Sequence, residues 1–439
     1  MESVFAGTLA RGAAASEVTG AAWLAAMLDA EAGLAAAHAA LGLVPGDAAA
    51  AIAAACRPER FDAHALGEAA GLSGNPVVPL VKALRELVPA EHRGQVHLGA
   101  TSQDILDTAA MLVAGRALVP LTADLDAAAD ACAALAVRHR DTVLPGRTLL
   151  QQAVPTTFGL KAAGWLTALT AARDRLRALR RPVQYGGAAG TLSALGDRGH
   201  EVVAAFATEL GLDEPLVPWH TDRTPVAGLA CALGIAAGVL AKIATDVKLL
   251  AQTEVGEAAE PSAPGRGGSS AMPHKRNPVG AISVLACAQR VPGLVGAVLA
   301  GMAQEHERAA GAWQAEQETL SDLLRLTGSA ASWAREILEG LSVDEARMRA
   351  NLAATGGLPM AESVVARLGG GPRARALVDA ACARAVAEGR PLGEVLAADA
   401  DVRLTPAEIG AALDPAGYLG SAGAFVDRAL ARRDTRENR

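Results

Sequence analysis

Chemically useful side chains are concentrated in one segment, Gly267-Gly-Ser-Ser-Ala-Met-Pro-His-Lys-Arg-Asn-Pro278. Its glycines leave backbone N–H groups open, and successive N–H groups can form a concave site for an anion. The short basic run His274-Lys275-Arg276 adds cationic donors to the same loop, beside two serines and Asn277. A solvated loop between helices would explain the glycines and prolines, but not the whole string. The pattern therefore favours a site for a small anionic ligand.

Polar groups also gather in two segments nearer the N-terminus, His97-Leu-Gly-Ala-Thr-Ser-Gln-Asp104 and Gly146-Arg-Thr-Leu-Leu-Gln-Gln-Ala-Val-Pro155. In the first, Thr and Ser after Gly are typical of a helix N-cap. A capped helix N-terminus also attracts anions, so capping and ligand binding are compatible there.

Two later positions allow both a structural and a functional interpretation. His220 and Arg223 come just before a long helical pattern, where a histidine beside a tryptophan can be structural or can meet a ligand. For Arg308 and His306, which alternate with two glutamates, the residues themselves indicate an exposed, salt-bridged helix face.

Together these segments resemble the signature blocks of the fumarase/aspartase superfamily, which includes argininosuccinate lyase, adenylosuccinate lyase and carboxymuconate cycloisomerase. The glycine-rich loop matches the superfamily motif GSSxMPxKxNP, and the two earlier segments match its first and second blocks. The similarity covers nearly the whole chain and is nearest to the bacterial cycloisomerases in Gly74–Lys82, Pro218–Arg223, Gln252–Glu257, Gln304–Arg308 and Asp414–Gly420.

The resemblance implies that Ser269 is the catalytic group, which exchanges a proton at the carbon α to a substrate carboxylate. Preorganised donors stabilise the charge that this step places on the carboxylate. A closing loop would supply the N–H groups and cations that a serine alkoxide needs, and would exclude water. By the same resemblance, the substrate-binding residues are Thr101, Ser102, Gln103, Thr148, Gln151, His220, Arg223, Ser270, Lys275, Arg276, Asn277 and Arg308.

One position departs from the lyases and points to the reaction. Their second block contains Thr-His, whereas this chain has Thr148 followed by Leu149. Leucine cannot protonate a leaving amine or hydroxide, which needs an acid partner. A leaving carboxylate needs none, because its conjugate acid has a pKa of about 4. We therefore expect lactonisation of 3-carboxy-cis,cis-muconate to 4-carboxymuconolactone, in protocatechuate degradation by the β-ketoadipate pathway.

Composition and periodicity predict an all-α protein. Hydrophobic residues are 51% and aromatics 3% of the 439 residues, and alanine, the best helix former, is abundant. Long helical patterns cover 118–139, 155–181 and 225–260, and 291–341 contains at least two more. We expect three helical domains at 1–107, 108–343 and 344–439, the second being a long central bundle. Its helices are too apolar for one buried face, so chains should pack together through them.

The remaining expectations concern partners and compartment. The net charge of −7 and the lack of a basic block argue against nucleic-acid binding. The apolar run 224–241 fits a core helix better than a membrane span. Five scattered cysteines and the polar residues near the N-terminus favour the cytoplasm. No nucleotide motif or metal-ligand spacing is present, so neither cofactor nor metal is expected. The resemblance implies a homotetramer with shared active sites, acting on a small tricarboxylate.

Two rival functions stay open. An adenylosuccinate lyase-like C–N lyase that releases fumarate is disfavoured by Leu149. A non-catalytic helical scaffold, like the lens crystallins of the superfamily, is disfavoured by the intact Ser269, Lys275 and Asn277.

Overall fold

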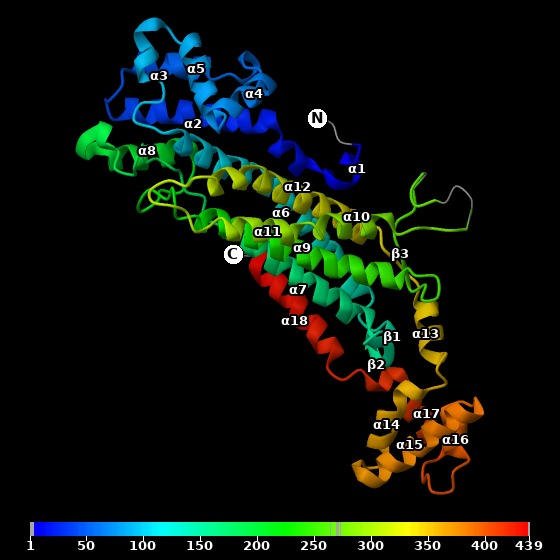
Figure 1. Ribbon diagram of the computed structural model, residues 1–439. Coiled ribbons are helices and arrows are strands. Elements are labelled where there is room, and N and C mark those ends of the chain that lie inside the picture. The colour runs from blue at the N-terminus through cyan, green and yellow to red at the C-terminus, as the bar shows by residue number, and fades with distance from the viewer. Residues whose placement is uncertain (1–3, 264, 269–271, 273, 438–439) are drawn as a thin grey trace. The chain divides into compact units, whose positions relative to one another are not determined.

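The computed structural model describes residues 4–437 except 264, 269–271 and 273. Nearly all of its regular structure is helical, which confirms the predicted all-α class (Figure 1). The α-helices are α1 Ala6–Leu9, α2 Gly20–Ala40, α3 Gly46–Ala55, α4 Ala63–Ser73, α5 Val77–Leu87, α6 Ser102–Arg138, α7 Phe158–Arg177, α8 Gly199–Leu210, α9 Thr224–Leu250, α10 Val279–Ala288, α11 Val291–Ala300, α12 Ala312–Glu339, α13 Glu345–Ala353, α14 Ala361–Arg367, α15 Gly371–Glu388, α16 Leu392–Ala397, α17 Pro406–Leu413 and α18 Ala422–Glu437. The strands are β1 Val143–Thr148, β2 Gln151–Thr157, β3 Ala258–Ala259 and β4 Ser342–Val343.

The chain forms two compact units that alternate along the sequence. Unit 1 comprises Met1–Leu125, Ala172–Ala241 and Ser283–Trp333, and unit 2 comprises Asp126–Ala171, Lys242–Ile282 and Ala334–Arg439. The division at 107 and 343 that the sequence suggested stays a prediction.

Two of the predicted helices have different ends in the structure. α6 begins at Ser102, which agrees with the helix N-cap indicated by the first block and extends the helical pattern predicted from 118. The Thr101 N–H donates to Asp104 Oδ2 at 2.9 Å and so caps the first turn. α9 ends at Leu250 and not at Glu260. The chain turns at Gly256, whose φ of 62° suits glycine, and then forms β3, which pairs with β4. Glu254 and Glu257 consequently do not share a helix.

An antiparallel hairpin occupies part of a region predicted to be helical. β1 pairs with β2, and α7 begins only at Phe158, not at Pro155. Pro145 and Pro155 face each other in the hairpin. The turn residues Leu149 and Leu150 have φ of 50° and 66°, a left-handed conformation that leucine rarely adopts. Because no Asn-Gly or Asp-Gly pair signals this turn, periodicity alone missed it.

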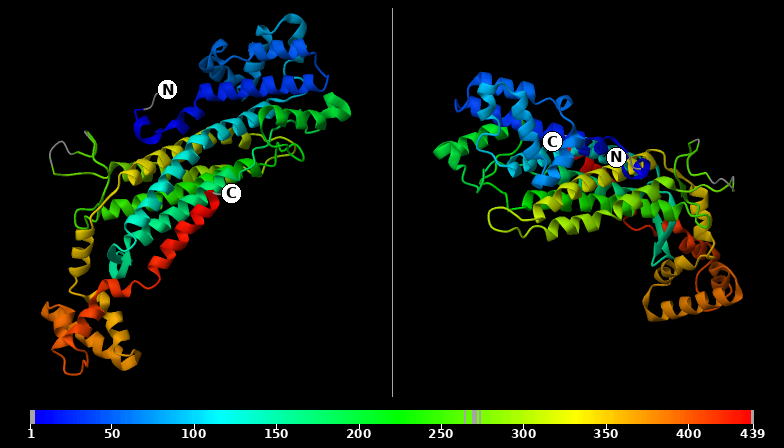
Figure 2. Two further views of the ribbon diagram at one scale, coloured as in Figure 1. Left: turned by 180° about the vertical axis from the view of Figure 1, so that it is seen from behind. Right: turned by 45° about the horizontal axis from the view of Figure 1, so that its top comes forward.

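Each unit has its own apolar core. In unit 1, α2 packs against α3 and α8, and Gly33 permits the close approach, since a Cβ there would lie 2.7 Å from Leu210. In unit 2, α14 to α17 surround a core that includes Val378, Leu392 and Leu396. These helices, coloured orange, lie together in both views of Figure 2.

Candidate active site

The first block lies at the start of α6 and meets a loop that precedes α12. Arg308 Nη1 donates to Thr101 Oγ1, and Arg308 Nε donates to Gln103 Oε1 at 3.3 Å. Arg308 lies in 301–311, which is not helical, so the helix considered for it in the sequence was wrong. His306 in this loop has φ of 49°. The fold thus brings three of the predicted substrate-binding residues together.

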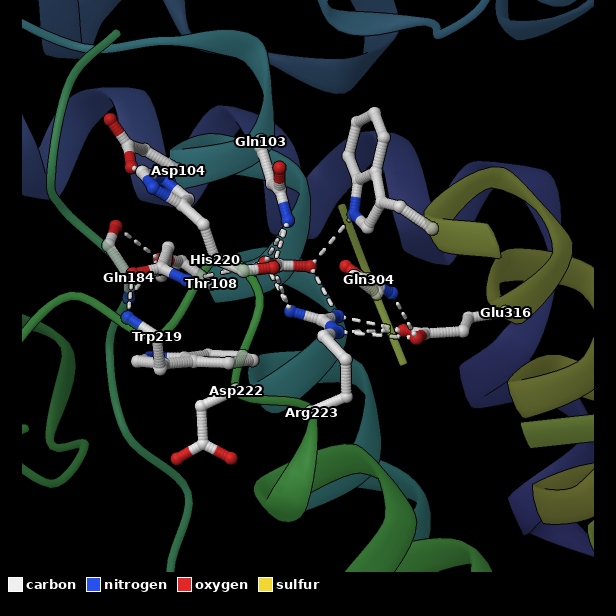
Figure 3. Close-up of polar contacts among 12 residues, drawn as sticks. Gln103, Asp104, Thr108, Gln184, Trp219, His220, Asp222, Arg223, Gln304 and Glu316 are labelled. Atoms are coloured by element: carbon white, nitrogen blue, oxygen red, sulfur yellow. Dashed lines mark hydrogen bonds and ion pairs between the residues drawn. The ribbon is translucent and has the colours of Figure 1, made fainter. Parts of the chain in front are cut away.

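Gln103 also belongs to a buried network of polar side chains that includes Arg223 and Glu316 (Figure 3). Arg223 donates to Asp107 through Nη1 at 2.8 Å and Nη2 at 3.0 Å. Its Nη2 also donates to Glu316 Oε2 at 2.7 Å. Trp313 Nε1 adds a bond to Asp107 Oδ1 at 3.0 Å. One guanidinium therefore holds two buried carboxylates.

Burial and charge act against each other in this network. Burial by itself lowers the pKa of Arg223, but Asp107 and Glu316 outweigh it and raise that pKa above its ordinary value. Burial raises the pKa of Glu316, and Arg223 only partly opposes this effect. Arg223 is 2% exposed, so its side chain is satisfied inside unit 1 and its predicted substrate contact stays a prediction.

His220 is also buried and paired. Its Nε2 lies 2.6 Å from Asp104 Oδ1, and the N–H groups of Gly186 and Gly187 each donate to Asp104 at 2.9 Å. This arrangement anchors the first turn of α6 to the segment before α8. The structure supports the structural alternative for His220, and contact with a substrate stays a prediction.

Ser102 faces a different environment from Thr101. It lines a groove of about 430 Å³ together with the basic residues Lys82, Arg85, Arg93 and His97. Guanidinium groups of Arg85 and Arg93 donate to backbone carbonyls, at 3.1 Å in each case. Glu86 and three valines also line the groove, so its charged residues are mainly but not entirely basic.

The second block forms the tip of the β1–β2 hairpin in unit 2. Thr148 and Gln151 pair at the end of the ladder, and both are exposed. Leu149 is 96% and Leu150 is 79% exposed. By contrast, Gln152 Nε2 donates to the backbone oxygen of Asn351 at 3.1 Å, which gives Gln152 a structural partner.

A buried glutamate fastens this hairpin to neighbouring segments of unit 2. Arg147 donates to Glu257 from both Nη atoms, at 2.8 and 2.6 Å, and Asn351 Nδ2 donates to Glu257 Oε1 at 2.7 Å. The Glu257 side chain is 0% exposed. Sequence reasoning missed this role, because the partners lie about a hundred positions apart.

The third block is only partly described, since Ser269 and Ser270 lie outside the described residues. Lys275 and Arg276 are exposed. Asn277 N donates to Gly267 O at 2.9 Å, and Asn277 Nδ2 donates to the same oxygen at 3.2 Å. A Cβ at Gly267, which has φ of 68°, would lie 2.6 Å from Asn277 O. The two ends of the motif are therefore tied together, and only glycine fits there without a shift.

The helix that follows the loop is capped by an acid. Glu260 accepts hydrogen bonds from Gly280 N at 2.9 Å and Ala281 N at 2.6 Å, and it pairs with Arg266. Arg266 also contacts Glu336. Among the described residues, no group of three or more His, Cys, Asp or Glu side chains could hold a metal ion.

Two models of known protein families match this chain. A family model described as "Lyase" matches residues 10–293, and one described as "Adenylosuccinate lyase C-terminus" matches residues 357–429. The chain belongs to the fumarase/aspartase superfamily. This agrees with the resemblance in the three blocks and makes the chain a member of an enzyme superfamily.

Individual members of the superfamily are similar along most of this chain. A 3-carboxy-cis,cis-muconate cycloisomerase of Bradyrhizobium diazoefficiens is 51% identical, over 92% of each chain. A nitrosuccinate lyase of Streptomyces davaonensis is 50% identical, over 95% of this chain and 92% of its own. The crystal structure of the 3-carboxy-cis,cis-muconate lactonizing enzyme from Pseudomonas putida superposes with a TM-score of 0.93, at 45% identity and 99% coverage of both chains.

The residues that hold the site segments in place, and that the sequence did not single out, are mostly acidic. Asp104, Asp107, Glu257 and Glu316 each hold a predicted functional segment in place. Asp104 ends the first block and Asp107 follows three positions later, a spacing that puts both on one side of a helix. That spacing could have identified Asp104 and Asp107 from the sequence, whereas no neighbouring residue indicates a role for Glu316.

Proposed function

We propose that this protein converts 3-carboxy-cis,cis-muconate to 4-carboxymuconolactone, in protocatechuate degradation by the β-ketoadipate pathway. The observation that carries the proposal is the similarity of about half of all residues, along nearly the whole chain, to enzymes named for this substrate. The departure at Leu149 supports it, because a reaction between a carboxylate and an alkene needs no acid for a leaving amine.

In this reaction one substrate carboxylate oxygen bonds to a diene carbon. Ser269 transfers its hydroxyl proton to the carbon α to another carboxylate and regains a proton from solvent. Lys275, Asn277 and Arg308 hold the substrate carboxylates, with Arg308 as a guanidinium clamp. Overall a trianion takes up one proton and becomes a dianion.

The hydrogen-bond partners of Arg308 leave its charge free for a substrate carboxylate. Thr101 and Gln103 are neutral groups, and among the described residues no carboxylate forms an ion pair with Arg308. Its positive charge is therefore available to a ligand, unlike that of Arg223.

A second candidate is elimination of nitrite from nitrosuccinate, favoured by the 50% identity to a nitrosuccinate lyase over 95% of this chain. A base removes the proton α to one carboxylate, and nitrite departs from the neighbouring carbon to leave fumarate. Nitrite is a weak base, so it also leaves without a general acid. Leu149 argues against the C–N lyases that expel an amine, but it does not separate these two candidates.

We infer that the protein acts as a cytoplasmic homotetramer in which different copies supply the three blocks. Apolar helices support this assembly, since the most apolar window of 224–250 is only 56% buried, and that of 279–300 only 33% buried, within one chain. Exposed leucines at the hairpin tip point the same way. All five cysteines are free, as in reducing compartments. Sedimentation of the purified protein measures the assembly directly.

Proton stoichiometry separates the two reactions in one assay. Lactonisation takes up one proton per turnover and removes diene absorbance, whereas nitrite elimination releases one proton and forms fumarate. We expect proton uptake with 3-carboxy-cis,cis-muconate in a weakly buffered indicator solution. Proton release with nitrosuccinate, and no turnover of the muconate, would replace the first proposal by the second.

A serine variant tests the assigned proton carrier. Ser269→Ala should lower kcat by at least about 10²-fold, the smaller effect typical of a lost general acid or base. Ser262→Ala is a matched control, because Ser262 is an exposed serine seven positions earlier. Equal activity of the two variants would remove Ser269 from the mechanism.

A further inference from the structure

Two arginines of unit 1 have opposite electrostatic surroundings. Arg223 is buried between Asp107 and Glu316, so its charge is compensated within the protein. Arg308 is half-buried, and its partners in the described part of the chain are the Thr101 hydroxyl and the Gln103 amide oxygen. Within the described residues, the N–H groups of Arg308 Nη2 donate to no protein atom. The Arg308 guanidinium is thus fixed by neutral hydrogen-bond partners, and no carboxylate of the described residues balances its charge.

The orientation of the Gln103 amide is fixed from the other side. Gln103 Nε2 donates to the backbone oxygen of His220 at 2.9 Å and to Asp107 Oδ2 at 3.2 Å. Neither of these oxygens can donate, so a flipped amide would face two acceptors with its own oxygen. Gln103 is 1% exposed, so bulk solvent does not reach the amide to satisfy that alternative. Its oxygen must therefore face Arg308.

Asp107 is itself held by several donors. Both Nη atoms of Arg223 donate to it at 2.8 and 3.0 Å, and Trp313 Nε1 donates at 3.0 Å. Gln184 Nε2 donates a longer hydrogen bond to Asp107 Oδ2, at 3.4 Å. Such a carboxylate can neither rotate nor accept a further donor without loss of a bond, so it is a fixed acceptor for Gln103.

A second connection reaches the Arg308 loop from the same network. Glu316, the other partner of Arg223, accepts a hydrogen bond from Gln304 Nε2 at 3.1 Å. Gln304 stands four residues before Arg308 in the loop 301–311 (Figure 3 shows Gln304 beside Glu316). The buried network therefore holds the loop at two points, through Gln304 and through Gln103.

We propose that Gln103 and Asp107 are positioning residues for the Arg308 clamp. Asp107 fixes the amide of Gln103, and the amide oxygen fixes Nε of Arg308, which leaves the N–H groups of Nη2 for a carboxylate of the ligand. Gln103 then acts through Arg308 and does not itself touch the substrate. The inference rests on the proposed function only for the ligand being a polycarboxylate.

A double-mutant cycle tests whether Gln103 acts through Arg308. Arg308→Met should raise KM for the turned-over substrate by about 10–100-fold, as expected for a charge-assisted hydrogen bond, with a smaller change in kcat. Gln103→Met should raise KM by about 10-fold. The double variant should be no worse than Arg308→Met within about 2-fold. Multiplied effects, or a fall in kcat alone, would overturn the proposal.

A charge variant separates positioning from packing. Gln103→Glu keeps the shape of the side chain but compensates Arg308 with one carboxylate oxygen and turns the other toward Asp107 and the His220 carbonyl. The melting temperature should therefore fall, and KM of the folded variant should rise at least as far as in Gln103→Met. A purely structural role would lower the melting temperature and leave KM of the folded variant unchanged. Gln317→Met, a half-buried glutamine in α12 of the same unit, is the matched control and should leave KM unchanged.

Ligand binding tests the inference independently of the reaction. Calorimetry with propane-1,2,3-tricarboxylate should give a dissociation constant at least about 10-fold weaker for Gln103→Met than for wild type or Gln317→Met. Equal binding by all three proteins would overturn the positioning role. Absence of turnover with both candidate substrates would defeat the proposed function alone, because this binding comparison still decides the role of Gln103.

Discussion

Replacing Arg223 by methionine is expected to destabilise the protein by leaving two carboxylates buried without a cation. Arg223 is 2% exposed and donates five hydrogen bonds to Asp107 and Glu316. Removing one partner of a buried ion pair costs about 3–5 kcal/mol. At about 2–4 °C per kcal/mol for a cooperative unit of about 150–250 residues, the melting temperature should fall by roughly 6–20 °C.

The pH dependence of this loss has a definite sign. Burial already raises the pKa of Glu316, and removal of Arg223 takes away the charge that opposes this rise. A carboxyl whose pKa is raised in the folded state binds protons more tightly there than when unfolded, so stability is lost as pH rises. The deficit of Arg223→Met should therefore be larger at pH 8 than at pH 5.5.

Circular dichroism melts at fixed protein concentration measure both effects. Arg116→Met is the matched control, since Arg116 forms an ion pair with Asp29 at 2.6 Å in which both side chains are more than one third exposed. Such exposed pairs contribute about 0–1 kcal/mol. A fall of less than about 2 °C for Arg223→Met, or a deficit that does not change with pH, would refute the reasoning.

Two further predictions concern single side chains. Gly267→Ala should reduce kcat/KM by at least about 10-fold and lower the melting temperature by roughly 2–8 °C, because a Cβ would lie 2.6 Å from Asn277 O and a φ of 68° strains alanine by about 1–2 kcal/mol; kinetics of the variant that match wild type would contradict this. Burial lowers the pKa of His97, but Glu31 at 2.6 Å outweighs it and raises that pKa above its usual value of about 6.5. Stability from this pair is full below about pH 6.5 and is lost as pH rises through the raised pKa. His97→Asn, which tolerates the φ of 62°, should thus lower stability by about 1–3 kcal/mol at pH 6 and by less at pH 9 in melts, and the reverse order would disprove the pairing.

The sequence was sufficient to predict those properties that depend on composition or on residues a few positions apart. The loop motif at 267–278 and the first block at 97–104 identified the superfamily, and abundant alanine identified the helical class. Helix existence was predicted better than helix ends. The start of α6 depends on the Thr101–Asp104 cap, and the strands β1 and β2 depend on a left-handed turn at Leu149 and Leu150.

The partners of the charged residues could not be predicted, because they come from distant positions. Arg223 meets Asp107 across 116 positions and Glu316 across 93. Sequence placed Arg223 and Arg308 in the same class of carboxylate-binding arginines. The fold neutralises the first and leaves the second without a carboxylate among the described residues.

The sequence by itself thus determined the superfamily, the helical class and the chemical types in the three blocks, since these depend on composition and on residues a few positions apart. Only the tertiary structure decided which cation stays uncompensated, which amide end faces it and which acids hold it. Those properties arise when α6, the residues just before α9, the loop 301–311 and α12 are packed together, and a buried charge takes its role from the partners that burial gives it.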